Sequence, residues 1–189
     1  MGRTGTVKPR LRVHPSVVLW LSVLCYLKLS IVGPFLLSAL LHELGHTLSL
    51  CHLHKPPHSV TVAFSGAVME SPPLSYQEEL LAAFSGPAVS LLLGLSLPLW
   101  PELGFYSLIL GLFNLLPIRG LDGGRILRCL LFLSMPESRA RRICRSIGIV
   151  FSLLLFCIGI TLTLRFHAGI WPMACTAVLL YKALTTDSL

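Results

Sequence analysis

Residues 31–51 read IVGPFLLSALLHELGHTLSLC, an apolar run that contains three ionisable side chains, His42, Glu43 and His46. A helix needs roughly 20 apolar residues to cross about 30 Å of hydrocarbon, and this run has that length. A charged group inside such a span costs roughly 2.5 to 3.5 kcal/mol on insertion scales, so its presence points to a function. The stretch therefore predicts a membrane helix with a reactive polar centre.

The composition of the whole chain also indicates a membrane protein. Of its 189 residues, 54% are hydrophobic and 12% are charged, which is about half the charged share of a soluble domain. The formal net charge is +7, but long apolar runs separate the basic residues, whereas nucleic-acid binders cluster them on a hydrated face. We therefore expect no nucleic-acid partner. Six cysteines without a C-x-x-C pair predict neither a disulfide framework nor a zinc knuckle.

Six apolar stretches approach the length of a membrane span and form three closely linked pairs. They cover residues 13–30, 31–51, 80–97, 103–118, 146–164 and 168–181. With a cytosolic N-terminus, every Lys and Arg except Lys28 and Arg165 falls on the cytosolic side, as the positive-inside rule requires. We expect an all-α polytopic membrane protein with both termini in the cytosol. It would form one domain over residues 1–189, without a CBS or PDZ domain.

One long non-apolar insertion separates the second and third spans. Within it, residues 60–64 and 67–69 are rich in β-branched and apolar side chains, and they flank Ser65-Gly66. Such runs around a turn dipeptide are typical of a hairpin. The sequence predicts a short membrane-associated β-hairpin at about residues 59–70.

The stretch 42–46, HELGH, fits the pattern H-E-x-x-H. On a helix His42 and His46 share one face, so both imidazoles can bind one metal ion, and Glu43 lies about 100° around the axis, within reach of a water on that metal. The alternative is a polar network between helices with no metal. Selection against polar groups in a membrane span favours the metal site.

A catalytic zinc site usually has three protein ligands and one water, so a third ligand is needed. Aspartate occurs only at Asp122 and Asp187, and the predicted topology places Asp122 at the depth of His46. Gly123 and Gly124 would let the backbone turn closely beside the metal, and Pro117 would end the preceding helix. Taken alone, Asp-Gly-Gly would indicate only a helix-ending turn. With HELGH, it predicts one zinc ion per chain.

Two signatures together resemble those of the site-2 proteases, the intramembrane zinc metalloproteases of peptidase family M50. They are HELGH at 42–46 and the Asn114-x-x-Pro117-x-x-x-x-Asp122-Gly-Gly stretch after the fourth span. The stretch 85–90, SGPAVS, is similar to the family's glycine-proline motif. The short basic N-terminus and six-span layout look most like the stage IV sporulation FB branch. The match covers about residues 10–133.

The resemblance implies a zinc metalloendopeptidase that cuts membrane-associated proteins near the cytosolic face of a bacterial cytoplasmic membrane. His42, His46 and Asp122 would bind zinc, and Glu43 would act as the general base. The resemblance also assigns substrate binding or support of the site to a further set: Asn114, Pro117, Gly123, Gly86 and Ser90. Family members often have Asn at the position of Ser90, which puts a polar contact there in doubt.

The resemblance to the sporulation branch implies a membrane-tethered pro-sigma factor as substrate; outside that branch, the alternatives are an anti-sigma factor or a remnant signal peptide. The hairpin would pair with the unwound substrate strand. Other expected partners are membrane-protein regulators and anionic lipid at the basic cytosolic loop. A zinc transporter or a metal-binding membrane protein without protease activity is the alternative function. The same His and Asp groups would then lie along a conduction path.

Overall fold

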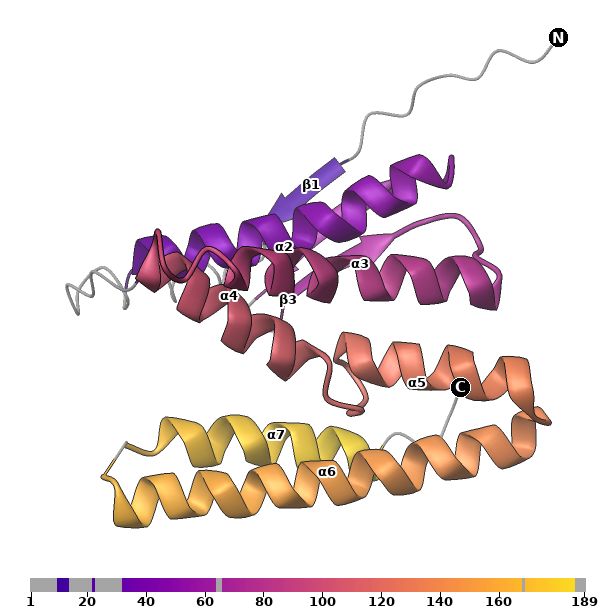
Figure 1. Ribbon diagram of the computed structural model, residues 1–189. Helices are drawn as coiled ribbons and strands as arrows, with labels where there is room; N and C mark the ends of the chain where they lie inside the picture. Colours follow the sequence, from indigo (N-terminus) through magenta and orange to yellow (C-terminus); the bar gives the residue numbers. More distant parts are fainter. Residues whose placement is uncertain (1–9, 14–21, 23–31, 64–65, 168, 186–189) are drawn as a thin grey trace, which may run out of the picture. The chain divides into compact units, whose positions relative to one another are not determined.

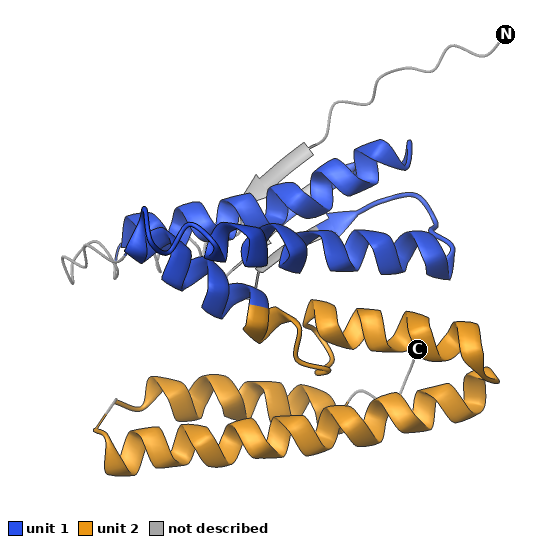
Figure 2. Cartoon of the chain, in the orientation of Figure 1, with its two compact units in different colours: residues 1–111 blue, residues 112–189 orange. Residues whose placement is uncertain are grey.

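The structure is a computed structural model that describes residues 10–13, 22, 32–63, 66–167 and 169–185 (Figure 1). This part of the chain is mostly helical. Its strands are β1 (Arg10–Val13), β2 (Ser59–Ala63) and β3 (Gly66–Glu70), and its helices are α2 (Val32–His52), α3 (Tyr76–Gly94), α4 (Pro101–Asn114), α5 (Asp122–Ser134), α6 (Glu137–Arg165) and α7 (Trp171–Thr185). The chain divides into two compact units, residues 1–111 and 112–189 (Figure 2).

Each predicted span after the first coincides with a helix. The stretches 31–51, 80–97, 103–118, 146–164 and 168–181 correspond to α2, α3, α4, α6 and α7, whereas span 13–30 lies almost entirely outside the described residues. Of the described helices, α6 alone combines the length and the apolar composition needed to cross a membrane. The number of spans therefore stays a prediction.

Small side chains form the contact between α2 and α3 in the first unit. A Cβ added at Gly45 would lie 2.8 Å from the Ser85 carbonyl oxygen, so the two backbones are close there. Ser38 on α2 bonds Ser107 on α4 over 2.8 Å between hydroxyl oxygens, and both are fully buried. Helices in membranes pack in this way, because small residues allow close approach while large apolar side chains face lipid.

The first unit also contains a three-stranded sheet, in which the strands have the order β1-β2-β3. Strands β2 and β3 are antiparallel, with Ser59 opposite Glu70 and Ala63 opposite Gly66, within the segment predicted as a hairpin. Its association with a membrane stays a prediction. Strand β1 runs parallel to β2, with Arg10 opposite Ser59. Strand β1 is not predicted from the sequence, in which the basic N-terminus indicates membrane topology and a likeness to the sporulation branch but no strand.

A capping box forms the start of α3, and an ion pair links it to Lys55 in the segment that follows α2. The Ser75 hydroxyl accepts a bond from the Glu78 N–H, and Glu78 Oε2 accepts one from the Ser75 N–H over 2.7 Å, which satisfies two otherwise unpaired donors. Lys55 Nζ lies 2.7 Å from Glu78 Oε2. The bond from Lys55, and then those from Ser75, lower the pKa of Glu78 to about 2.

In the second unit, α6 packs against α5 and α7. Helix α5 is not predicted from the sequence, where residues 122–124 indicate a turn. The structure corrects this: Asp122 is the first residue of α5, and Gly123 and Gly124 are helical. The apolar residues of α5 are interrupted by Arg125 and Arg128, so the segment did not have the uniform apolar character of a predicted span.

Candidate metal centre

His42 and His46 lie one helical turn apart on α2, and both are buried, with 4% and 8% of their surface exposed. The rings are edge to face, with centroids 4.9 Å apart. A turn of α-helix advances 3.6 residues, so positions i and i+4 present their side chains on the same face. The HELGH spacing therefore places both imidazoles against α3.

Helix α3 provides a hydrogen-bond partner for the Nδ1 atom of each ring. His46 Nδ1 donates to the Ala82 carbonyl oxygen over 2.7 Å, and His42 Nδ1 lies 2.8 Å from Ser90 Oγ. Histidines that bind metals usually hold their second ring nitrogen in a bond of this kind, which fixes the ring and leaves Nε2 for the metal. Ser90 thus contacts His42, whereas a contact from this position to substrate or to the hairpin stays untested.

The two Nε2 atoms lie 3.2 Å apart. Because His46 Nδ1 carries a proton for the Ala82 carbonyl, the Nε2 of a neutral His46 ring presents a lone pair. Bonds of 2.0–2.1 Å to one tetrahedral zinc ion would place two nitrogens about 3.3 Å apart. The spacing and the chemistry of the pair therefore fit a shared zinc ion.

Gly86 makes room for the His46 ring. A Cβ added at Gly86 would overlap the His46 Nε2, Cε1 and Cδ2 atoms, and Gly86 itself is buried on α3. The next residue, Pro87, has no N–H and therefore leaves the Ala83 carbonyl without its usual helical bond. The glycine-proline pair thus lets α3 approach the ring closely, which is a more specific role than the sequence analysis assigned to Gly86.

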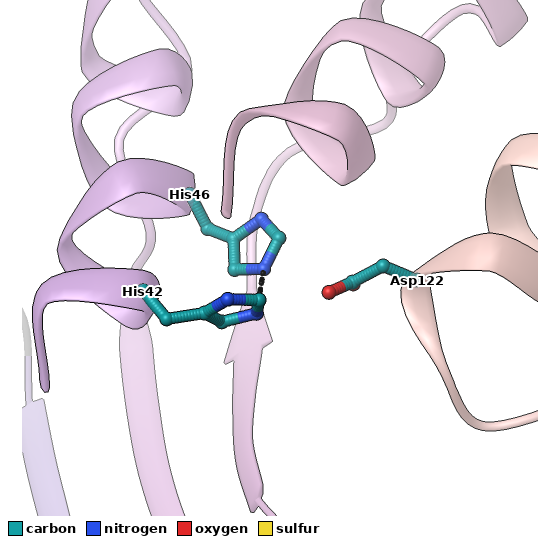
Figure 3. A group of neighbouring side chains, drawn as sticks. All are labelled: His42, His46 and Asp122. Atoms are coloured by element: carbon teal, nitrogen blue, oxygen red, sulfur yellow. Dashed lines mark hydrogen bonds between the residues drawn. The ribbon is translucent and has the colours of Figure 1, made fainter. Parts of the chain in front are cut away.

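Asp122 joins the two histidines in a group that could hold a metal ion. One ligand atom from each of His42, His46 and Asp122 lies within 4.8 Å of the other two (Figure 3). Two imidazoles and one carboxylate make a donor set found in catalytic zinc sites. Arg125 Nη1 lies 3.7 Å from Asp122 Oδ1, one turn along α5.

Gly123 has a role different from the predicted one, which was to let the backbone turn beside the metal. A Cβ added at Gly123 would overlap the Leu115 and Leu116 carbonyl oxygens, so glycine lets α5 begin directly against the preceding loop. Asn114 is the last residue of α4. Pro117 lies in that loop, three residues after α4 has already ended. The helix therefore ends before the proline.

Glu43 follows His42 on α2 and is partly exposed. Its backbone carbonyl accepts a bond from Thr47 Oγ1 over 3.0 Å. The Ala82 carbonyl is not predicted from the sequence, because it is a backbone group and carries no residue signature. The glycine-proline motif was the signal that could have found it.

Comparisons with known proteins agree with this chemistry. Residues 93–155 match the sequence profile described as Peptidase family M50. The zinc metalloprotease MJ0392 of Methanocaldococcus jannaschii is 29% identical over 65% of this chain and 40% of its own length. Rip3 of Mycobacterium tuberculosis is 32% identical over 82% of this chain and 43% of its own length, and its name describes it provisionally as a zinc metalloprotease.

A solved structure shares the fold. The site-2 protease from Methanocaldococcus jannaschii superposes with a TM-score of 0.67 at 22% identity, over 95% of this chain and 91% of that one. This chain spans less than half the length of the two curated relatives described above. Family profile, relatives and fold agree, and this chain contains a domain of peptidase family M50, the site-2 protease family of zinc metalloproteases.

Proposed function

We propose that this protein is an intramembrane zinc metalloendopeptidase in which His42, His46 and Asp122 hold the zinc ion. The observation that carries the proposal is the histidine pair. Its Nε2 atoms lie 3.2 Å apart, and α3 orients both rings through their Nδ1 atoms. This arrangement occurs in an H-E-x-x-H stretch of a chain with an M50 domain, and zinc is the metal named for its relatives.

In the proposed reaction Glu43 handles the proton. Zinc bound at this site would lower the pKa of a coordinated water to roughly 7 and polarise the carbonyl of the substrate peptide bond. Glu43 would accept the proton from the attacking water and then deliver it to the leaving amine. Ser90 and the Ala82 carbonyl would keep the two rings oriented meanwhile. Asn114 and Pro117 are proposed to support the substrate side of the site.

The sheet supports a way to hold the substrate. Among the described strands, the order β1-β2-β3 places β3 at an edge of the sheet, and an extended peptide can add to such an edge through main-chain hydrogen bonds. A substrate must be extended when it is cut, because a helix engages its carbonyls in its own hydrogen bonds. We propose membrane-associated proteins as substrates, and a membrane-tethered pro-sigma factor of sporulation as the specific case.

The exposed side chains support a membrane location. Large apolar residues project from the first unit with half or more of their surface exposed, among them Leu40 at 66%, Leu92 at 66% and Phe105 at 50%. Soluble monomers rarely expose apolar surface on this scale. We propose a multi-pass protein of a bacterial cytoplasmic membrane with both termini in the cytosol, where membrane-protein regulators would reach it. Anionic lipid would be attracted to its basic residues.

The Glu43→Gln variant tests the mechanism. The variant should insert into membranes normally but cleave about 10²- to 10⁴-fold more slowly, since that is the contribution of a positioned general base. Wild type and variant would be co-expressed with tagged membrane-associated candidates, including pro-sigma factors, and cleavage followed by the mobility of the tag. Undiminished cleavage by the variant would disprove the role of Glu43.

Zinc movement distinguishes the alternative function. A protease has no need to carry zinc across the bilayer, so sealed vesicles that contain the wild-type protein should take up no more zinc than empty ones. Zinc uptake that persists in the absence of any cleavable substrate would instead indicate a transporter.

A further inference from the structure

A basic pocket of about 270 Å³ lies within the second unit, formed by α5, α6, the loop before α5 and Ala183 of α7. We call it the arginine pocket after the six arginines that line it: Arg119, Arg125, Arg128, Arg141, Arg142 and Arg145. None of the described residues that line it is Asp or Glu. Its volume is just below the roughly 300–1,000 Å³ typical of sites for drug-sized ligands.

Helical spacing brings these arginines together. Arg125, Arg128 and Phe132 follow one another at intervals of three and four residues on α5, so they share a face. Arg141, Arg145 and Gly148 do the same on α6. The Arg141 guanidinium carbon lies 5.9 Å from the centre of the Phe132 ring, in a cation–π contact that joins the two faces.

Basic side chains outnumber acidic ones in the part of the second unit that the structure describes. Between residues 112 and 185 there are nine Lys and Arg residues but only two acidic ones, Asp122 and Glu137. Asp122 pairs with Arg125, and Glu137 pairs with Arg141. This excess of basic side chains around one small cavity favours a positive local potential, which would attract an anionic ligand.

We propose that the arginine pocket is a binding site for a phosphomonoester. A phosphomonoester carries about two negative charges near neutral pH and three terminal oxygens, and each guanidinium can donate two parallel hydrogen bonds to such a group. Apolar Leu127 and Phe132 also line the pocket, and they suit the carbon skeleton that bears the phosphate. The source is either the headgroup of a lipid such as phosphatidic acid or a soluble phosphomonoester. The proposal stands independently of the proteolytic function.

Binding to the full chain in detergent tests the proposal. Native mass spectrometry would count dioleoyl phosphatidic acid molecules bound to the wild-type protein. Dioleoyl phosphatidylcholine, whose zwitterionic headgroup is a phosphodiester without net charge, is the comparison. One phosphatidic acid should bind with about tenfold or greater preference. Arg128→Gln and Arg145→Gln should each lower that affinity about tenfold, because a hydrogen bond to a charged group contributes on the order of tenfold or more to affinity.

Arg139→Gln is the matched control. Arg139 lies on α6 like Arg145, but it does not line the arginine pocket. The Arg139→Gln substitution removes the same charge as Arg145→Gln. Arg139→Gln should change the affinity for phosphatidic acid less than twofold, because the salt in the detergent buffer screens exposed charges. An equal loss in Arg139→Gln and Arg145→Gln would indicate diffuse attraction and overturn the proposal, as would no loss in either pocket variant. Arg125 is left unchanged because it contacts a proposed zinc ligand.

Two further measurements complete the test. The first adds soluble sn-glycerol 3-phosphate to the protein with bound phosphatidic acid. Displacement of the lipid would identify a soluble phosphomonoester as a sufficient ligand. If the lipid stays bound, the ligand is the lipid headgroup. The second measurement follows alkylation of Cys144 by iodoacetamide in the unaltered chain, because Cys144 also lines the pocket. Phosphatidic acid at about ten times its Kd should slow alkylation of Cys144 roughly tenfold and leave exposed Cys51 unchanged. An unprotected Cys144 would overturn the proposal.

Discussion

Ser90 illustrates how much a single hydroxyl contributes to the metal centre. It is fully buried, and its oxygen lies 2.8 Å from His42 Nδ1. Partners of this kind orient the imidazole, and their removal typically weakens metal binding 10- to 100-fold. We therefore expect Ser90→Ala to lower zinc affinity by about that factor, measured by competition with a chromogenic chelator.

Ser107→Ala is the control for that experiment. Ser107 is also fully buried, but its hydroxyl bonds Ser38 and no histidine. Its removal should leave zinc affinity unchanged. If both variants lost zinc to the same degree, a general loss of packing would explain the result, and the orienting role of Ser90 would be wrong.

Gly86→Ala tests the close approach of α3 to His46. The added methyl would overlap the ring, so His46 must leave its position or the helices must separate, at a cost of about 1–3 kcal/mol typical of overpacking. We expect reduced zinc content by elemental analysis and a lower melting temperature.

Gly33→Ala provides the comparison for Gly86→Ala. A Cβ at Gly33 meets nothing within 4 Å, and alanine favours a helix more than glycine does. Zinc content should be that of the wild type and the melting temperature equal or higher. Normal zinc content in Gly86→Ala would show that the ring tolerates the methyl group.

At the scale of elements, the beginning of α3 carries a pH dependence. The pKa of Glu78 is lowered to about 2, so its stabilising contribution is complete above its ordinary pKa of about 4.5 and is lost as the pH falls towards 2. We expect Glu78→Gln to melt below the wild type at pH 6, with the difference vanishing near pH 2. Both proteins would be compared by circular dichroism at each pH.

Glu102→Gln is the appropriate control, because Glu102 is also an acidic residue in the first turn of a helix, α4. It removes a favourable charge at a helix N-terminus without breaking a capping box. A pH-dependent loss equal to that of Glu78→Gln would attribute the effect to the helix dipole alone.

Elements differ in how well the sequence predicted them. Helices α2, α3, α4, α6 and α7 each contain a long apolar run, and the length of such a run is visible in the sequence. Strand β1 and helix α5 were missed because each is short or interrupted by arginines. A four-residue strand is defined by its partner, here β2, and no local pattern can reveal that pairing.

At the scale of the whole molecule, the proposed zinc ligands come from distant parts of the chain, α2 and the first residue of α5. An asparagine at position 122 would keep the size of the side chain but replace an anionic ligand by a weak neutral one. We expect Asp122→Asn to bind substantially less than one zinc per chain, measured by elemental analysis of purified protein.

Asp187→Asn removes the other aspartate of the chain and is the matched control. It should retain full zinc content. A full complement of zinc in Asp122→Asn would exclude Asp122 as a ligand and would leave the two histidines in need of another partner.

The sequence by itself was enough to propose the zinc ligands and to predict the long helices, because the HELGH spacing, the scarcity of aspartate and the long apolar runs are all local or compositional features. Only the tertiary structure decided how the histidines are held. The Ala82 carbonyl, the Ser90 hydroxyl and the space left by Gly86 act on α2 from α3. Hydrogen bonds and close packing between helices depend on the position of one backbone relative to another, and local patterns of residues do not reveal that position.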